Sequence, residues 1–426
     1  MSTPLHNRAA KHILVDHFGV VYDLDKSTGN FFRDKNSNRE YLDVFSFIAS
    51  CPIGHNHPAL NDPEFEKKIL RAAKCNPSNS DILTEEFVEF IETFARVARP
   101  AYLQDSFFIA GGTLAVENAL KTAFDWKYRK LIERGIKVNY NDLKIVHFKH
   151  AFHGRSGYCL SLTNTADPRK YDLFPKFHKW PRLSTPAIHE KYTDDEQKIR
   201  DEKFYQNALD VIDLQGHECA AIIIEPIQGE GGDNHFTKAF HQSLRKIADE
   251  KEMLLIYDEV QTGVGLTGKM WAHQNYDVQP DIISFGKKMQ VCGISSGPRI
   301  REVAKNVFEE KSRINSTWGG NLVDMVRSQK YLEVIEQDNL VQNAATVGQY
   351  LLAKLKSLEV SNVRGMGLMC AFDLPTTKDR DAVVQRCFDN GAFLLGCGHL
   401  SVRLRPSLTF STQEVDLLID ILTKSL

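Results

Sequence analysis

Short apolar runs alternate with amphipathic stretches through the middle of the chain. Several apolar positions follow one another in each run, and turn residues bound it, which is typical of strands buried on both faces of a parallel sheet. The stretches between them carry apolar residues at helical spacing. We expect strands at 106–109, 144–148, 220–224, 253–257 and 281–286, and helices at 114–132, 197–213 and 240–251. This alternation predicts a doubly wound α/β domain.

Different patterns flank this central region. Residues 20–47 hold aromatic runs broken by Gly and Asn turns, which predict antiparallel strands outside the main sheet. An apolar face predicts a helix at 80–96, and a long helical region is expected from 315 to 358. The tail predicts strands at 363–369, 393–395 and 401–406 and a last helix from 413. We therefore expect a small α+β domain made of 1–60 and 321–426 and a large domain at 61–320.

Composition narrows the class of protein. The 426 residues are 42% hydrophobic and 25% charged, which is ordinary for a soluble globular protein. A net charge of −2 argues against nucleic acid or an anionic membrane as a partner, and no apolar segment predicts a membrane span or a leader. Eight cysteines without a Cys-x-x-Cys pair favour free thiols in a reducing cytoplasm over disulfides or zinc. His55 and His57 lack a third ligand at useful spacing, so we expect no metal.

Two predicted strands end in residues that bear chemistry. Asp258 follows the run at 253–257, and Lys287 follows the run at 281–286. Such residues are more often solvated surface groups than parts of a site. In open α/β sheets, however, ligands bind beyond the carboxyl ends of the strands. An aspartate facing a pyridinium nitrogen and a lysine that forms an imine are what pyridoxal phosphate requires of a protein.

Two further strand ends could complete such a site. The strand at 106–109 leads through Gly111 into Gly112 and Thr113 and then a helix, an arrangement that points free N–H groups at an anion. Phe152 and Arg155 follow the strand at 144–148. An aromatic face can stack on a ring cofactor, and an arginine fork can bind a carboxylate. Each feature alone is weak, because most such turns and loops only reverse the chain.

The chain resembles the class III (ω-amino acid) aminotransferases over essentially its whole length. The motifs that carry the resemblance are Asp-Glu-Val-Gln-Thr-Gly at 258–263 and, at 280–287, Pro-Asp followed by a small apolar strand and Lys. The motifs at 150–158, 285–293 and 315–318 look closest to the lysine ε-aminotransferase branch. The resemblance implies pyridoxal phosphate, fold type I with a mainly parallel sheet of the seven-stranded type, and an obligate homodimer. The family's usual phosphate-binding motif, Ser-Gly-Ser/Thr, is replaced by Gly111-Gly112-Thr113 here, which removes one hydroxyl donor.

The resemblance also assigns roles at the cofactor. Lys287 becomes the imine lysine and proton carrier, and Asp258 keeps the pyridine nitrogen protonated, so these two are the expected catalytic residues. Lys288 is left structural. The remaining cofactor contacts that it implies are phosphate binding by Gly112 and Thr113, ring stacking by Phe152, a hydrogen bond from Gln261, and contacts from Glu225 and, across the dimer interface, Thr317.

For the substrates, the resemblance implies transfer of the ε-amino group of L-lysine to 2-oxoglutarate. The products would be L-glutamate and 2-aminoadipate 6-semialdehyde, which cyclises to 1-piperideine 6-carboxylate. Arg155 would anchor lysine, with Asn315 nearby, and Arg403 would bind the α-carboxylate of glutamate. Glu230 would pair with Arg403 while lysine is bound. Arg405, two residues on, is the alternative to Arg403.

Two other functions stay open at this point. A 4-aminobutyrate or other ω-amino acid aminotransferase is the first, since the sequence does not fix which ω-amine is preferred. A binding protein with this fold but no turnover is the second. The joint presence of Lys287, Asp258 and Glu230 argues against it, because a binding module needs no such set.

Overall fold

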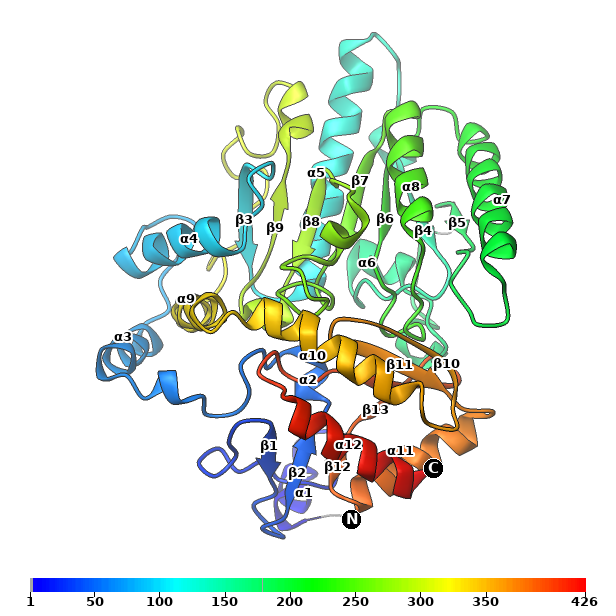
Figure 1. Ribbon diagram of the computed structural model, residues 1–426. Helices are drawn as coiled ribbons and strands as arrows, with labels where there is room; N and C mark the ends of the chain where they lie inside the picture. Colours follow the sequence, from blue (N-terminus) through cyan, green and yellow to red (C-terminus); the bar gives the residue numbers. More distant parts are fainter. Residues whose placement is uncertain (1–2, 178) are drawn as a thin grey trace.

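The main element of the computed structural model, which describes residues 3–177 and 179–426, is a seven-stranded sheet. Its strand order is β3-β9-β8-β7-β6-β4-β5 (Figure 1). The strands are β3 (Asp105–Ile109), β4 (Lys144–Phe148), β5 (Arg182–Leu183), β6 (Cys219–Ile224), β7 (Leu254–Asp258), β8 (Ile282–Phe285) and β9 (Cys292–Ser296). β9 runs antiparallel to both of its neighbours, and the other pairings are parallel. The predicted mainly parallel sheet is confirmed.

Helices cover both faces of this sheet because its strands are apolar on both sides. Helix α5 (Gly112–Glu133) packs on one face, and α8 (Lys238–Glu250) with α7 (Asp194–Asp213) covers the other (Figure 1). Leu254 and Ile256 of β7 lie in the core cluster that contains α5, whereas Leu255 and Tyr257 lie in the cluster that contains α8. Alternate residues of one strand therefore fill two cores, as the pleat requires.

The two ends of the chain build the rest of the molecule together. β2 (Glu40–Asp43) pairs antiparallel with β1 (Phe31–Arg33) and parallel with β12 (Ala392–Phe393). The predicted antiparallel strands outside the main sheet are thus confirmed. A separate antiparallel sheet holds β10 (Ser361–Met366), β11 (Met369–Asp373), β14 (Ser401–Leu404) and β13 (Leu395–Cys397), in that order. The domain boundaries near residues 60 and 320 stay a prediction, and residues 1–2 of the first segment lie outside the described part.

Two predicted helical segments differ from the structure in their bounds. The helix expected from residue 80 begins later, as α4 (Glu85–Val97), because the Thr84 side chain caps it by accepting from the N–H of Phe87. The helical region expected from residue 315 is non-helical to residue 321 and then forms two helices, α9 (Leu322–Gln337) and α10 (Leu340–Leu355). Asn339, with a left-handed φ of 53°, separates them. The remaining helices are α1 (Pro4–Ala9), α2 (Ser46–Ala49), α3 (Pro63–Lys74), α6 (Gly157–Leu162), α11 (Thr377–Asp389) and α12 (Thr412–Ser425).

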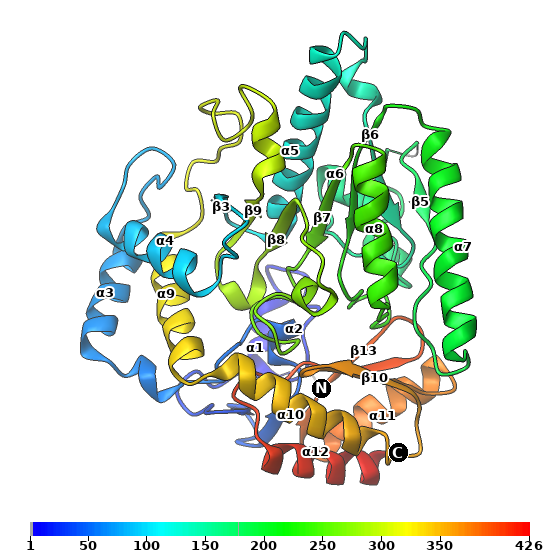
Figure 2. The same ribbon diagram turned by 45° about the horizontal axis from the view of Figure 1, so that its top comes forward.

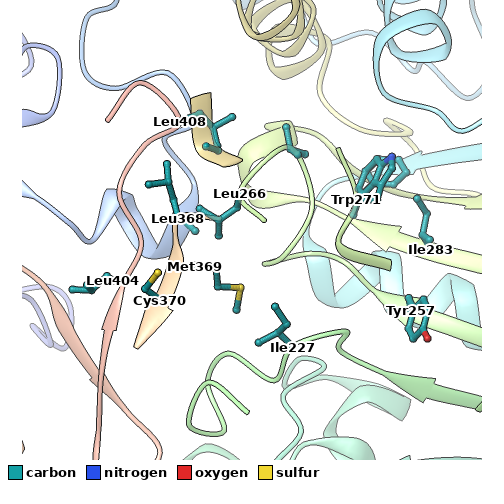
Figure 3. Packing of buried hydrophobic residues seen from close by; sticks show 14 of the residues in the cluster. Ile227, Tyr257, Leu266, Trp271, Ile283, Leu368, Met369, Cys370, Leu404 and Leu408 are labelled. Atoms are coloured by element: carbon teal, nitrogen blue, oxygen red, sulfur yellow. The ribbon is translucent and has the colours of Figure 1, made fainter. Parts of the chain in front are cut away.

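A shared apolar core joins the two parts. Tyr257 and Ile283 of the large sheet belong to the same cluster as Met369 of β11 and Leu404 of β14 (Figure 3). Helix α10 lies between the large sheet and α12 in both ribbon views (Figures 1 and 2). None of the helices in the described part has the length and apolar character needed to cross a bilayer.

Candidate active site

A cavity of about 580 Å³ lies at the carboxyl ends of the central strands. This is the edge at which the sequence predicts a site, because the carboxyl ends of parallel strands meet there. The predicted residues that line the cavity are Gly112, Thr113, Phe152, Arg155, Glu225, Asp258, Gln261 and Lys287. These residues are spread over positions 112 to 287 of the chain, and the fold of the sheet brings them together.

Asp258, the last residue of β7, is buried and held by three donors. The Nδ1 atom of His153 lies 2.8 Å from Oδ2, while Ser284 Oγ at 3.0 Å and the N–H of Val260 at 3.2 Å donate to Oδ1. Neither His153 nor Ser284 was predicted from the sequence as a site residue. Ser284 follows from strand register, since β7 and β8 pair Asp258 with Ser284, whereas nothing in the sequence singles out His153 from its neighbours. The carboxylate is therefore fixed in orientation and can face a cationic ring nitrogen.

Lys287 begins a short turn after β8 and has a left-handed φ of 50°. Burial, with the help of the nearby Arg403 guanidinium and against the opposing effect of Asp258, lowers the pKa of its ε-amine to about 8. A much larger share of this amine is neutral near pH 8 than for a free lysine, so it can act as a nucleophile or a base. Lys288 does not line the cavity; its Nζ donates to the carbonyl oxygens of Gln261 at 2.6 Å and Ala49 at 3.3 Å.

The first turn of α5 offers an anion site. The helix starts at Gly112 without a side-chain cap, so its first N–H groups are free to bind a ligand. The Thr113 Oγ1 atom lies beside them and accepts from the N–H of Arg155 at 3.2 Å. Gly154 passes so close that a Cβ there would lie 1.5 Å from Thr113 Oγ1, and its φ is +120°. Glycine is therefore required at this position to bring the two segments together.

Glu225 and Gln261 complete the wall of the cavity. Glu225 accepts from the N–H groups of Phe152 at 2.9 Å and Gly229 at 3.2 Å. Burial, together with the Asp258 carboxylate and against the opposing effect of His153, raises the pKa of Glu225 to about 7. Gln261 Oε1 accepts from Arg405 Nε at 3.1 Å, which leaves the amide NH₂ of Gln261 as a donor.

These groups fit pyridoxal phosphate. The uncapped start of α5 suits its phosphate, the fixed Asp258 carboxylate suits its ring nitrogen, and the low-pKa amine of Lys287 suits its aldehyde. Phe152 lies half-buried in the wall, and Arg155 lies exposed with its guanidinium carbon 6.0 Å from the centre of the Phe152 ring.

A second cluster contains Arg403 and Glu230, which were predicted to pair while lysine is bound. Arg403 Nη1 donates to Glu230 Oε2 at 2.7 Å, and the Arg403 side chain is 5% exposed. Arg405 instead pairs with Asp233 and bonds to Gln261. Of the two arginines, Arg403 is thus the one in contact with Glu230. Neither Arg403 nor Glu230 lines the cofactor cavity, but both act electrostatically on Lys287.

Asn315 and Thr317 lie outside the cavity of their own chain. Both are exposed. The loop that carries them is held by Ser78 Oγ, which donates to the Thr317 carbonyl at 2.5 Å. Ser80 Oγ likewise donates to the Ser316 carbonyl at 2.5 Å. A contact of Thr317 with the site of a second subunit stays a prediction.

Comparison with known proteins matches residues 15–426 to the family model "Aminotransferase class-III". The chain is 46% identical over 419 residues to the L-lysine-epsilon aminotransferase of Mycobacterium tuberculosis, which covers 97% of this chain and 93% of that protein. It is 33% identical to a probable mitochondrial 4-aminobutyrate aminotransferase of Caenorhabditis elegans over 95% of this chain and 87% of that protein. The solved lysine aminotransferase from M. tuberculosis in the internal aldimine form superposes with a TM-score of 0.97 at 46% identity, covering 100% of this chain and 99% of that one. These matches establish that the chain belongs to the class-III aminotransferases.

Proposed function

We propose that this chain is an L-lysine 6-aminotransferase that uses pyridoxal phosphate. It transfers the ε-amino group of L-lysine to 2-oxoglutarate and gives L-glutamate and 2-aminoadipate 6-semialdehyde, which cyclises to 1-piperideine 6-carboxylate. The higher identity to lysine-epsilon aminotransferases than to 4-aminobutyrate aminotransferases supports lysine over the latter substrate.

The observation that carries the proposal is the ion pair between Arg403 and Glu230. Lysine reacts at its ε-amine, so its α-carboxylate would lie far from the reacting carbon, and the exposed Arg155 at the cavity would bind it. Arg403 then needs another anion, since an unpaired buried cation is strongly destabilising, and Glu230 supplies it. Glutamate reacts at its α-carbon and brings its own carboxylate to Arg403. One site can thus accept two substrates of different charge pattern.

The residues of the cavity have roles in holding the cofactor and in moving a proton. When bound, pyridoxal phosphate supplies a carbonyl group that takes up the amine and a ring that withdraws electrons. Asp258 would hold the proton on the ring nitrogen, and Gln261 would donate to the ring's phenolic oxygen. The neutral amine of Lys287 would take the proton from the substrate carbon that carries the amino group and hold it for return after the amino group has moved. Gly112 and Thr113 would bind the phosphate through their N–H groups.

Half-reactions with single substrates test the proposal. Purified protein loaded with pyridoxal phosphate is mixed in turn with lysine, ornithine, 4-aminobutyrate and glutamate, and the visible spectrum is followed. We expect rapid spectral change with lysine and glutamate, and 1-piperideine 6-carboxylate as the product from lysine. Faster reaction with 4-aminobutyrate than with lysine would replace the proposal by its first competitor, and no reaction with any amine would favour a binding protein.

The assembly and location are also part of the proposal. We expect a homodimer in which Thr317 and Asn315 complete the site of the partner subunit, because both lie exposed and away from their own cavity. The eight cysteines are free, which fits the cytoplasm predicted from the sequence.

A further inference from the structure

Glu230 lies between two cations rather than one. Its Oε2 atom bonds to Arg403, while its Oε1 atom bonds to Nζ of Lys170, the last residue of the short turn η3 (Pro168–Lys170). The side chain of Lys170 is 18% exposed and that of Glu230 is 21% exposed, against 5% for Arg403. The carboxylate thus spans from the buried arginine toward solvent.

We propose that Lys170 is a positioning residue that holds Glu230 after it leaves Arg403. This inference rests on the proposed function. When the α-carboxylate of glutamate or 2-oxoglutarate takes Arg403, Glu230 keeps its bond to Lys170 and turns toward it. Lys170 then prevents the displaced carboxylate from staying unpaired beside the incoming one, where like charges would repel each other.

Room for this movement exists on the Lys170 side. A hollow of about 340 Å³ borders both Lys170 and Glu230 and is separate from the cofactor cavity. Arg380, another cation that lines it, already bonds to Asp381 and to the carbonyl of Gly398. Lys170 is therefore the cation in the hollow that contacts Glu230.

Hydrogen bonds hold the backbone around Glu230, so the proposed movement from Arg403 toward Lys170 is one of the Glu230 side chain alone. The Glu230 carbonyl accepts from the N–H of Gly398 at 3.2 Å. On the following residues, the Arg364 guanidinium donates to the carbonyls of Gly232 at 2.6 Å and Asp233 at 2.7 Å. A carboxylate that can only rotate about its own side-chain bonds needs a partner within reach of that rotation, and Lys170 already lies there.

Electrostatics agree with a shared carboxylate. Burial raises the pKa of Glu230, yet Arg403 and Lys170 together bring it below its usual value. The carboxylate is thus charged while both cations bond to it, and Lys170 is the cation left to stabilise it once a substrate carboxylate takes Arg403.

Replacing Lys170 by methionine tests the inference, because methionine keeps much of the length of the side chain but not the charge. We expect binding of glutamate and 2-oxoglutarate to weaken by about three- to fivefold, the effect of losing a partly exposed charge pair. The lysine half-reaction should change by less than about twofold, because the pair of Glu230 with Arg403 is retained. Lys170→Arg should restore binding of the dicarboxylates. Single-turnover rates against substrate concentration give each value.

The neighbouring cation provides a matched control. Arg169 belongs to the same turn, is 89% exposed and pairs with Asp167, so Arg169→Met removes one positive charge without touching Glu230. It should leave both half-reactions unchanged. Equal losses in both halves for Lys170→Met, no loss in either, or the same loss in Arg169→Met would overturn the inference. Failure of the unaltered protein to react with lysine would instead overturn the proposed function.

Discussion

Removing Glu230 should affect the two half-reactions unequally. In a Glu230→Ala variant, Arg403 is left without its carboxylate partner whenever lysine occupies the site. Breaking a fully buried ion pair costs about 3–5 kcal/mol. The Glu230 side chain is 21% exposed, so water can enter its place, and we reduce the expected loss to about 2–3 kcal/mol. That corresponds to a fall of about 30- to 160-fold in the second-order rate constant for lysine.

Glutamate should be spared in the same variant, because its own α-carboxylate neutralises Arg403. Stopped-flow absorbance under single-turnover conditions measures each half separately. Asp167→Ala is the control, since Asp167 borders the same hollow but pairs with Arg169 and not with Arg403; it should affect neither half. Arg403→Ala should show the reverse pattern, with glutamate and 2-oxoglutarate lost and lysine retained. Equal losses in both halves for Glu230→Ala would refute the reasoning and leave Glu230 as a scaffold residue.

Three further predictions concern the cofactor. Lys287→Ala should lose the visible absorbance band and the adduct that borohydride traps; mass spectrometry of the digested protein locates that adduct, and finding it on Lys288 would contradict the assignment. Asp258→Asn should keep the fold, as judged by circular dichroism, but lose at least about a hundredfold in turnover, because a neutral amide no longer holds the ring proton; near-normal turnover would argue against that role. Uptake of pyridoxal phosphate by cofactor-free protein should speed up as pH rises through about 8 and then level off, because the pKa of Lys287 is lowered to about 8 and its neutral amine is the reacting form; a rate that keeps rising to pH 10 would show an ordinary lysine.

The sequence predicted the large sheet well because its strands are apolar on both faces and end in turn residues. Lys144–Phe148 was predicted to the residue. Strand β9 (Cys292–Ser296) was missed, since its small polar residues Ser295 and Ser296 look like a loop although they are buried. Helix ends depended on capping side chains such as Thr84, which periodicity does not detect.

The site was predicted in parts. Residues that belong to recognisable motifs at strand ends, such as Asp258 and Lys287, lie together at the cavity. His153 was missed because its role arises from the contact with Asp258. Lys170 was missed because its turn carries no recognisable motif. Both contacts join segments that are distant in sequence, and only the fold defines them.

The pairing of the two ends of the chain has a consequence for its synthesis on the ribosome. Strand β2 lies between β1 and β12, and Asn30 bonds to Glu414, 384 residues further along. At typical rates of translation, the first strands wait about 20 to 80 s for these partners. During that time the rings of Phe32 and Tyr41 lack Phe393, against which they are buried in the finished protein. A nascent chain of this protein should therefore expose an aggregation-prone segment around β1 and β2 until β12 and Glu414 leave the exit tunnel.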